Sequence, residues 1–90
     1  MAESFAPDAG IAGAQLMGDL VRGSARWAVY LEVALAPDGT AVRGRLHFVQ
    51  ADRRRETAWI FLERTDREVR ERFAEFSSGE LWALLESLAP

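Results

Sequence analysis

Residues 26–50, RWAVYLEVALAPDGTAVRGRLHFVQ, decide the fold of this chain. Large apolar side chains recur at every second position on both sides of the central APDGT: Trp27, Val29, Leu31, Val33 and Leu35, then Val42, Leu46 and Phe48. This period of two is typical of a β-strand with one apolar face. Tight turns favour each residue at the centre of this stretch. Pro37 has a fixed φ, Asp38 can form local side-chain hydrogen bonds, and Gly39 can adopt the left-handed conformation. The stretch therefore predicts an antiparallel hairpin.

The two faces of this hairpin also predict a register. Placing Leu35 opposite Thr40 keeps the apolar residues together and sets Glu32 opposite Arg43, a favourable cross-strand pair. A slip of one residue would put leucines on the same face as arginines and the histidine. We therefore predict the register that starts from Leu35 and Thr40.

The next segment divides into a polar and an apolar part. Residues 51–56, ADRRRE, predict a polar connection, and residues 57–63, TAWIFLE, predict a third strand. In that strand Trp59 and Phe61 would lie on one face, and Ala58, Ile60 and Leu62 on the other. A strand that is apolar on both faces is expected to be covered on both sides or to border a larger assembly.

Two helices are predicted to follow. Thr65 with Glu68, and Ser77 with Glu80, have the spacing of capping boxes, and the sequence SSG separates the two segments. Apolar side chains recur at helical spacing in both: Val69, Phe73 and Phe76 in the first, and Leu81, Leu84, Leu85 and Leu88 in the second.

The N-terminal part of the chain is less clear. Residues 1–10 are small, acidic and turn-forming, which is typical of a flexible tail. Residues 11–25 are compatible with a helix, a strand or a flexible segment. Gly13 and Gly18 would each cost a helix about 1 kcal/mol relative to alanine. The alternation of Leu16, Gly18 and Leu20 with polar or flexible neighbours favours a strand, with RGS as the turn into the next one.

Together these elements predict an α+β fold. We expect a three- or four-stranded antiparallel β-meander followed by two C-terminal α-helices packed on one face. The 90 residues allow a single small domain, expected over residues 11–90. The content of 49% hydrophobic and 28% charged residues is that of a globular protein.

Composition also narrows the chemistry and the compartment. The chain has no cysteine, which excludes disulfides and thiolate metal ligands. It contains neither a secretory signal pattern nor an apolar run of about 18 residues, so we expect a cytoplasmic protein without membrane contact. All eleven basic residues are arginines, and lysine and asparagine are absent, which suggests a GC-rich bacterial genome rather than selection for arginine.

The arginines fall into two groups. Those of the first helix alternate with acids and form three pairs spaced by four residues: Asp66 with Arg70, Arg67 with Glu71, and Glu68 with Arg72. This pattern favours a solvated, self-neutralised helix. Five other arginines are less well compensated and form the expected electrostatic rim, which would steer an acidic partner: Arg43, Arg45 and the loop Arg53, Arg54 and Arg55.

His47 is the only histidine, and a lone imidazole without cysteines makes a poor metal site. As a general base it would need an orienting acid and a nucleophile, and Glu32 is the one acid expected near it across the sheet. No catalytic or phosphate-binding motif is present. We therefore expect no cofactor and no enzymatic activity, and an outer-face structural role for His47.

The sequence predicts apolar surface that the core leaves uncovered, since two helices cover only one face of the sheet. Such surface on a small protein usually marks a partner site. The expected contact residues are Tyr30, Trp59, Ile60 and Trp82. We predict a non-catalytic protein–protein interaction or assembly module, of the adaptor, chaperone or immunity type. It would bind a protein partner or itself through an open sheet face, most simply as a homodimer.

Three alternatives stay open at this point. The N-terminal segment could fold over the open face. The arginines 53–55 could join Tyr30, Arg43, Arg45 and His47 in a nucleic-acid surface, with affinity that falls steeply with salt. A small enzyme or ligand-binding domain could instead be centred on His47.

Overall fold

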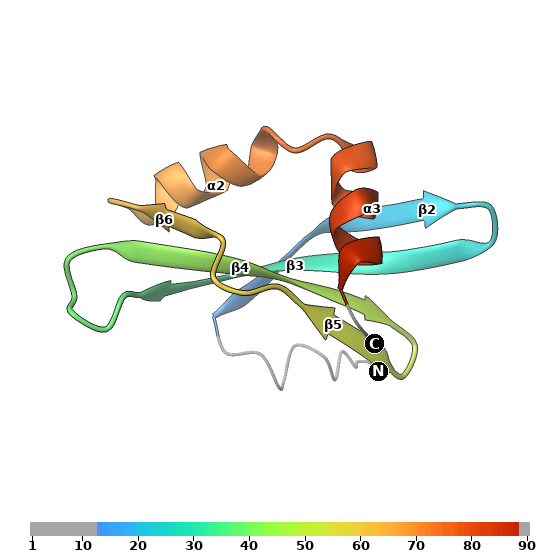
Figure 1. The fold of residues 1–90 in the computed structure, drawn as a ribbon, viewed down its shortest axis with the longest axis horizontal. Coiled ribbons are helices and arrows are strands. Elements are labelled where there is room, and N and C mark those ends of the chain that lie inside the picture. Colours follow the sequence, from blue (N-terminus) through green and yellow to red (C-terminus); the bar gives the residue numbers. More distant parts are fainter. Residues whose placement is uncertain (1–12, 89–90) are drawn as a thin grey trace.

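The computed structural model describes residues 13–88, in which five antiparallel strands precede two helices. The elements are β2 (Ala14–Arg22), β3 (Ala25–Leu35), β4 (Val42–Gln50), β5 (Arg53–Glu56), β6 (Phe61–Glu63), α2 (Asp66–Ala74) and α3 (Ser78–Ser87). Strands β2 to β5 form a meander, and β6 pairs with the first part of β4. Both helices lie on one face of the sheet (Figure 1). The predicted α+β architecture is thus confirmed, while the tail expected at residues 1–10 lies outside the described residues.

We call the face under the helices the inner face and the opposite one the outer face. Alternation along the central hairpin divides its side chains between these faces as predicted, but the predicted register is wrong by two residues. Leu35 pairs with Val42 rather than with Thr40, and Glu32 pairs with Arg45. The reason lies in the turn, where the Asp38 carboxylate accepts hydrogen bonds from the backbone N–H and the hydroxyl of Thr40. Thr40 is therefore held inside the loop.

Residues 11–25, whose sequence is compatible with a helix, a strand or a flexible segment, contain a strand over Ala14–Arg22, as the alternation favoured. Its alternation is interrupted, however, by a bulge between Leu16 and Gly18. Leu16 pairs with Tyr30 on the outer face, whereas Leu20 pairs with Trp27 on the inner face. The expected turn at residues 23–24 is present.

Residues 51–63 differ most from the prediction. The arginines at 53–55 are part of strand β5 rather than of a loop, because a two-residue turn at Ala51 and Asp52 folds them back onto β4. Residues 57–60 are not a strand. The Leu46 N–H donates its hydrogen bond to the Thr57 hydroxyl, whereas in a continuous strand it would donate to a backbone carbonyl.

The core fills the space between the inner face and the helices. Its fully buried side chains come from the central strands and both helices: Val29, Leu31, Leu46, Phe48, Val69 and Leu85. Gly44 lies where α2 approaches the sheet most closely, since a Cβ added there would lie 2.7 Å from Val69 Cγ1. Phe61 packs into the same region, edge-on to Phe76.

The two helix starts have the side-chain caps that the sequence predicts. Ser77 and Glu80 form a complete capping box at α3. At α2 the Thr65 hydroxyl accepts from the Glu68 N–H, but the Glu68 carboxylate accepts from the N–H of Arg64 instead of that of Thr65. Neither helix of residues 13–88 combines the length and the apolar character needed to cross a lipid bilayer.

Candidate interaction surface

Two of the four expected contact residues are buried rather than exposed. Tyr30 lies on the outer face but is only 5% exposed, and Trp82 is 8% exposed. The flank of α3 that carries Trp82 packs toward β2, where the Arg22 guanidinium stacks on the indole at 4.5 Å. Trp59 is half-buried, and Ile60 is exposed. Burial therefore leaves Tyr30 and Trp82 with little surface to offer a partner in this conformation.

The expected arginine rim is divided between the two faces of the sheet. Because side chains alternate along β5, Arg53 and Arg55 lie on the inner side and Arg54 on the outer side. The guanidinium groups of Arg53 and Arg55 lie 5.2 and 5.3 Å from the Trp27 ring centre, and Arg55 also donates to the Leu85 carbonyl near the end of α3. Both arginines lie against Trp27 and belong to a strand, so the prediction of one continuous basic loop is wrong.

The other two rim arginines enclose Trp59 on the outer face. The guanidinium groups of Arg43 and Arg45 lie 4.1 and 4.3 Å from its ring centre. Trp59 and Phe61, which were expected on one face, therefore lie on opposite faces. Cation–π contacts of this kind hold both arginine side chains over the ring and reduce their freedom to reach a ligand.

Next to Trp59, Glu32 is the centre of a charged network. Its Oε1 accepts a hydrogen bond from Arg45 Nε at 2.8 Å and lies 2.7 Å from His47 Nε2. Glu56 on β5 joins from the other side, 3.4 Å from both Arg45 and His47. Burial acts to raise the pKa of Glu32, but the hydrogen bonds and positive charge of Arg45 and His47 outweigh it, so the pKa of Glu32 is lowered.

The histidine of this network is closed to solvent. His47 is 2% exposed, and its Nδ1 has no partner with hydrogen-bond geometry despite the nearby Glu56. The Thr57 hydroxyl, which follows β5, donates to the Ala58 carbonyl. The hollows described below lie elsewhere, and residues 13–88 contain no group of three potential metal ligands. The arrangement ties β3, β4 and β5 together electrostatically.

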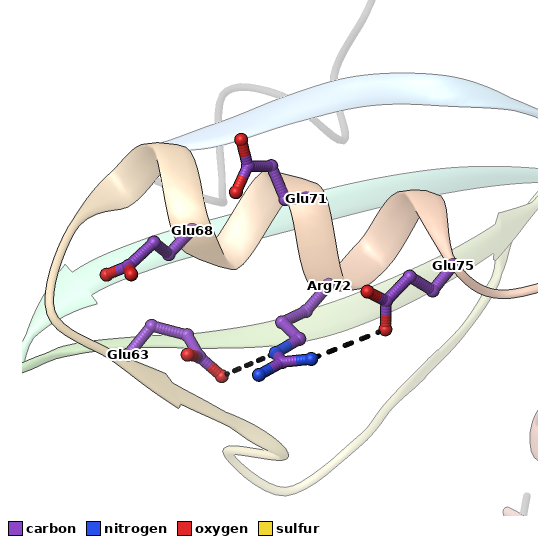
Figure 2. A pocket seen from close by; sticks show the side chains of 5 residues that line it. All are labelled: Glu63, Glu68, Glu71, Arg72 and Glu75. Carbon is purple, nitrogen blue, oxygen red and sulfur yellow. Dashed lines mark hydrogen bonds and ion pairs between the residues drawn. The ribbon is translucent and has the colours of Figure 1, made fainter.

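A hollow beside α2 is lined almost entirely by acids. Figure 2 shows Arg72 reaching between Glu63 and Glu75; Glu68 and Glu71 also line the hollow. The Arg72 guanidinium lies 3.3 Å from Glu63 and 3.6 Å from Glu75, and the negative charge of Glu63 first and then of Glu75 raises its pKa.

The arginines of α2 are accordingly neutralised, as expected, although one pairing differs from the prediction. Arg70 pairs with Asp66 and Arg67 with Glu71, but Arg72 does not pair with Glu68. These are exposed pairs of little individual strength.

Exposed apolar side chains lie at two opposite margins of the outer face, and a further one, Leu35 at the end of β3, is 67% exposed. Leu16 and Val21, on the outermost strand β2, are 54% and 53% exposed. Leu62 on β6 is 67% exposed, and Ile60 precedes it. Figure 1 shows that no helix of residues 13–88 covers this face.

The β2 margin also borders an apolar hollow on its inner side, next to the turn between the helices. The residues lining this hollow are Met17, Gly18, Asp19, Leu20, Val29, Phe73, Ser78 and Leu81. We define the β2 margin as Leu16, Val21 and this hollow. Sequence reasoning missed it, although one signal was present: Leu20 and Val21 are adjacent, so one of them must face outward from any strand.

Comparison with known proteins adds nothing to these observations: no protein-family model, curated protein or solved structure matches the chain.

Proposed function

We propose that the protein is a non-catalytic, self-associating assembly module whose contact surface is the β2 margin of the open sheet. The observation that carries this proposal is the pair of half-exposed side chains, Leu16 and Val21, on the outer face of β2, the edge strand of the sheet within residues 13–88. Apolar side chains clustered on a sheet margin are costly in water and are typical of contact surfaces. A second copy of the chain is the simplest partner, because a symmetric dimer buries the same surface on both subunits.

The charges of the outer face favour protein association over nucleic-acid binding. A nucleic-acid surface needs arginines that are free to contact phosphates and aromatic rings that are free to stack on bases. Here Arg45 is paired with Glu32 and Glu56, and Tyr30 is buried. The outer-face arginines that would remain for such a role are Arg43, which is held on Trp59, and the exposed Arg54 of β5.

The arrangement of His47 likewise favours a structural role over catalysis. A general base must reach the proton that it removes, and the imidazole is buried with one nitrogen on a carboxylate. The Glu32–His47 pair therefore acts to hold the outer face rigid, so that this face is preorganised for contact with a partner.

The proposal is tested by placing charges at the two margins of the outer face. We expect the double variant Leu16→Lys, Val21→Lys to be monomeric in sedimentation velocity at concentrations where the unaltered chain is associated. The matched control is Ile60→Lys, Leu62→Lys, which carries the same added charge at the opposite margin and should associate normally. If the first variant still associates and the second does not, the contact surface is at β6 rather than at the β2 margin.

A further inference from the structure

We infer that two copies associate by antiparallel pairing of their β2 strands about a two-fold axis, which joins the two sheets into one. This inference rests on the proposed self-association and specifies its geometry. Within residues 13–88, β2 pairs with β3 on one side and with no strand on the other. Its outer edge therefore presents a row of backbone groups that can form a ladder with a second strand.

The hairpin between β2 and β3 determines which backbone groups face outward. Arg22 and Ala25 flank its two-residue turn, and in such hairpins the flanking pair is hydrogen-bonded. Hydrogen-bonded and non-hydrogen-bonded pairs alternate along an antiparallel ladder, so Leu20 directs its N–H and C=O toward β3. Asp19 and Val21 direct theirs away from the sheet.

Apolar surface flanks this edge on both sides. Leu16 and Val21 lie on the outer face, and the hollow formed with Phe73 and Leu81 lies on the inner face. A second strand laid along Asp19 and Val21 would therefore bury apolar surface above and below the new ladder. The edge carries two protective features, the bulge before Gly18 and the charges of Asp19 and Arg22, and these leave the segment from Asp19 to Val21 as the part that can accept a second strand.

The charges of this stretch are compensated within each copy. Asp19 accepts a hydrogen bond from Arg26 at 2.7 Å, and Arg22 lies 3.3 Å from Glu86. With a two-fold axis near Leu20, each Asp19 lies opposite Val21 of the partner subunit, so pairing brings no uncompensated charge into the contact. The bulge at Leu16 and Gly18 ends the regular ladder on one side and the β2–β3 turn ends it on the other, which limits the contact to a short segment.

Amide hydrogen exchange of the unaltered chain tests this geometry. At concentrations below association, the amides of Asp19 and Val21 should exchange quickly and that of Leu20 slowly, since only Leu20 bonds to β3. At concentrations where sedimentation shows the dimer, the Asp19 and Val21 amides should become protected at least about tenfold, as in other hydrogen-bonded strands. A dimer in which both amides still exchange as in the monomer would overturn the edge pairing and leave the proposed self-association standing.

Two variants of one residue give an independent test. Val21→Pro removes the outward N–H and is tolerated on an edge strand, whereas Val21→Thr keeps that N–H and a β-branched side chain. Because each symmetric dimer loses two intermolecular hydrogen bonds, we expect Val21→Pro to weaken association by at least about tenfold relative to Val21→Thr. Circular dichroism should show both variants folded. Equal dimer affinities for two folded variants would contradict the inference, and a chain that is monomeric at every concentration would overturn both the inference and the proposed function.

Discussion

Glu32 is the residue on which the outer face depends most, because its one carboxylate holds both Arg45 and His47. Its folded-state pKa is lowered, so its ionised form stabilises the fold above the ordinary value of 4.5. This stabilisation is lost as the pH falls through the lower folded-state pKa. We therefore predict that part of the stability lost in acid comes from Glu32.

The substitution Glu32→Gln should reduce the free energy of unfolding by about 1–3 kcal/mol at pH 7, the usual range for hydrogen bonds to a charged group. It should also flatten the loss of stability between pH 5 and acid conditions, measured by urea unfolding at a series of pH values. Glu71→Gln is the control, since Glu71 is an exposed partner of Arg67 on α2. If both variants followed the acid dependence of the unaltered chain, Glu32 would not be the responsible group.

Gly44 is the residue at which packing leaves no room for a side chain. Because a Cβ there would lie 2.7 Å from Val69 Cγ1 and 3.3 Å from Phe61, the helix or the ring must shift in Gly44→Ala. We predict a loss of about 1–3 kcal/mol in urea unfolding, as for other overpacked sites. Gly79→Ala is the control, because its Cβ would meet no atom closer than 3.9 Å. A Gly44→Ala variant as stable as Gly79→Ala would show that α2 does not approach the sheet in this way.

Among the elements, α3 is the one whose start is fixed by a complete capping box. Removing the Ser77 hydroxyl leaves the Glu80 N–H without its acceptor, so Ser77→Ala should lower stability by about 1 kcal/mol in thermal unfolding. Ser78→Ala changes the first helical residue without touching the cap and should be nearly neutral. Equal losses in the two variants would argue against a role for the cap.

The turn between β4 and β5 carries backbone strain at Ala51, whose φ is +48°. A non-glycine residue in this region lowers the stability of the fold by about 1–2 kcal/mol through steric strain. A glycine instead lowers it by about 0.5–1 kcal/mol, because glycine loses more conformational entropy on folding. The first effect is larger, so Ala51→Gly should stabilise the protein by about 0.5–1 kcal/mol in urea unfolding. Ala74→Gly, in the last turn of α2, should instead destabilise it. A destabilised Ala51→Gly would mean that the turn adopts another conformation.

The elements differ in how well their sequences predict them. The strands around the central turn and both helices were predictable, because alternation and capping residues are local signals. Strand β5 was not predictable, because three consecutive arginines are typical of a loop. Only the turn at Ala51, which places Arg53 and Arg55 over Trp27, makes them part of a strand. The hairpin register failed for a similar reason: the hydrogen bond from Thr40 to Asp38 involves side-chain geometry that strand alternation does not encode.

At the scale of the whole molecule, the sequence predicted an open sheet face but not which residues are exposed on it. Whether Tyr30 or Leu16 is exposed depends on tertiary neighbours, and Leu16 reaches the outer face only through the bulge before Gly18. Trp82 was expected to be exposed because it lies beside the apolar side chains that recur at helical spacing in α3. That spacing identifies the centre of the buried helix face better than its flanks. The apolar surface expected for a partner is present, but it lies at the margins of the sheet.

We propose that this apolar margin is covered by a second copy of the chain. The most direct measurement is the molar mass of the unaltered protein by light scattering, from dilute to concentrated solution. We predict a rise from the 10.0 kDa of one chain to twice that mass, with a plateau at the dimer because two-fold edge pairing closes the assembly. A constant mass of 10.0 kDa at every concentration would contradict the account, and continued growth beyond two chains would contradict its closed symmetry.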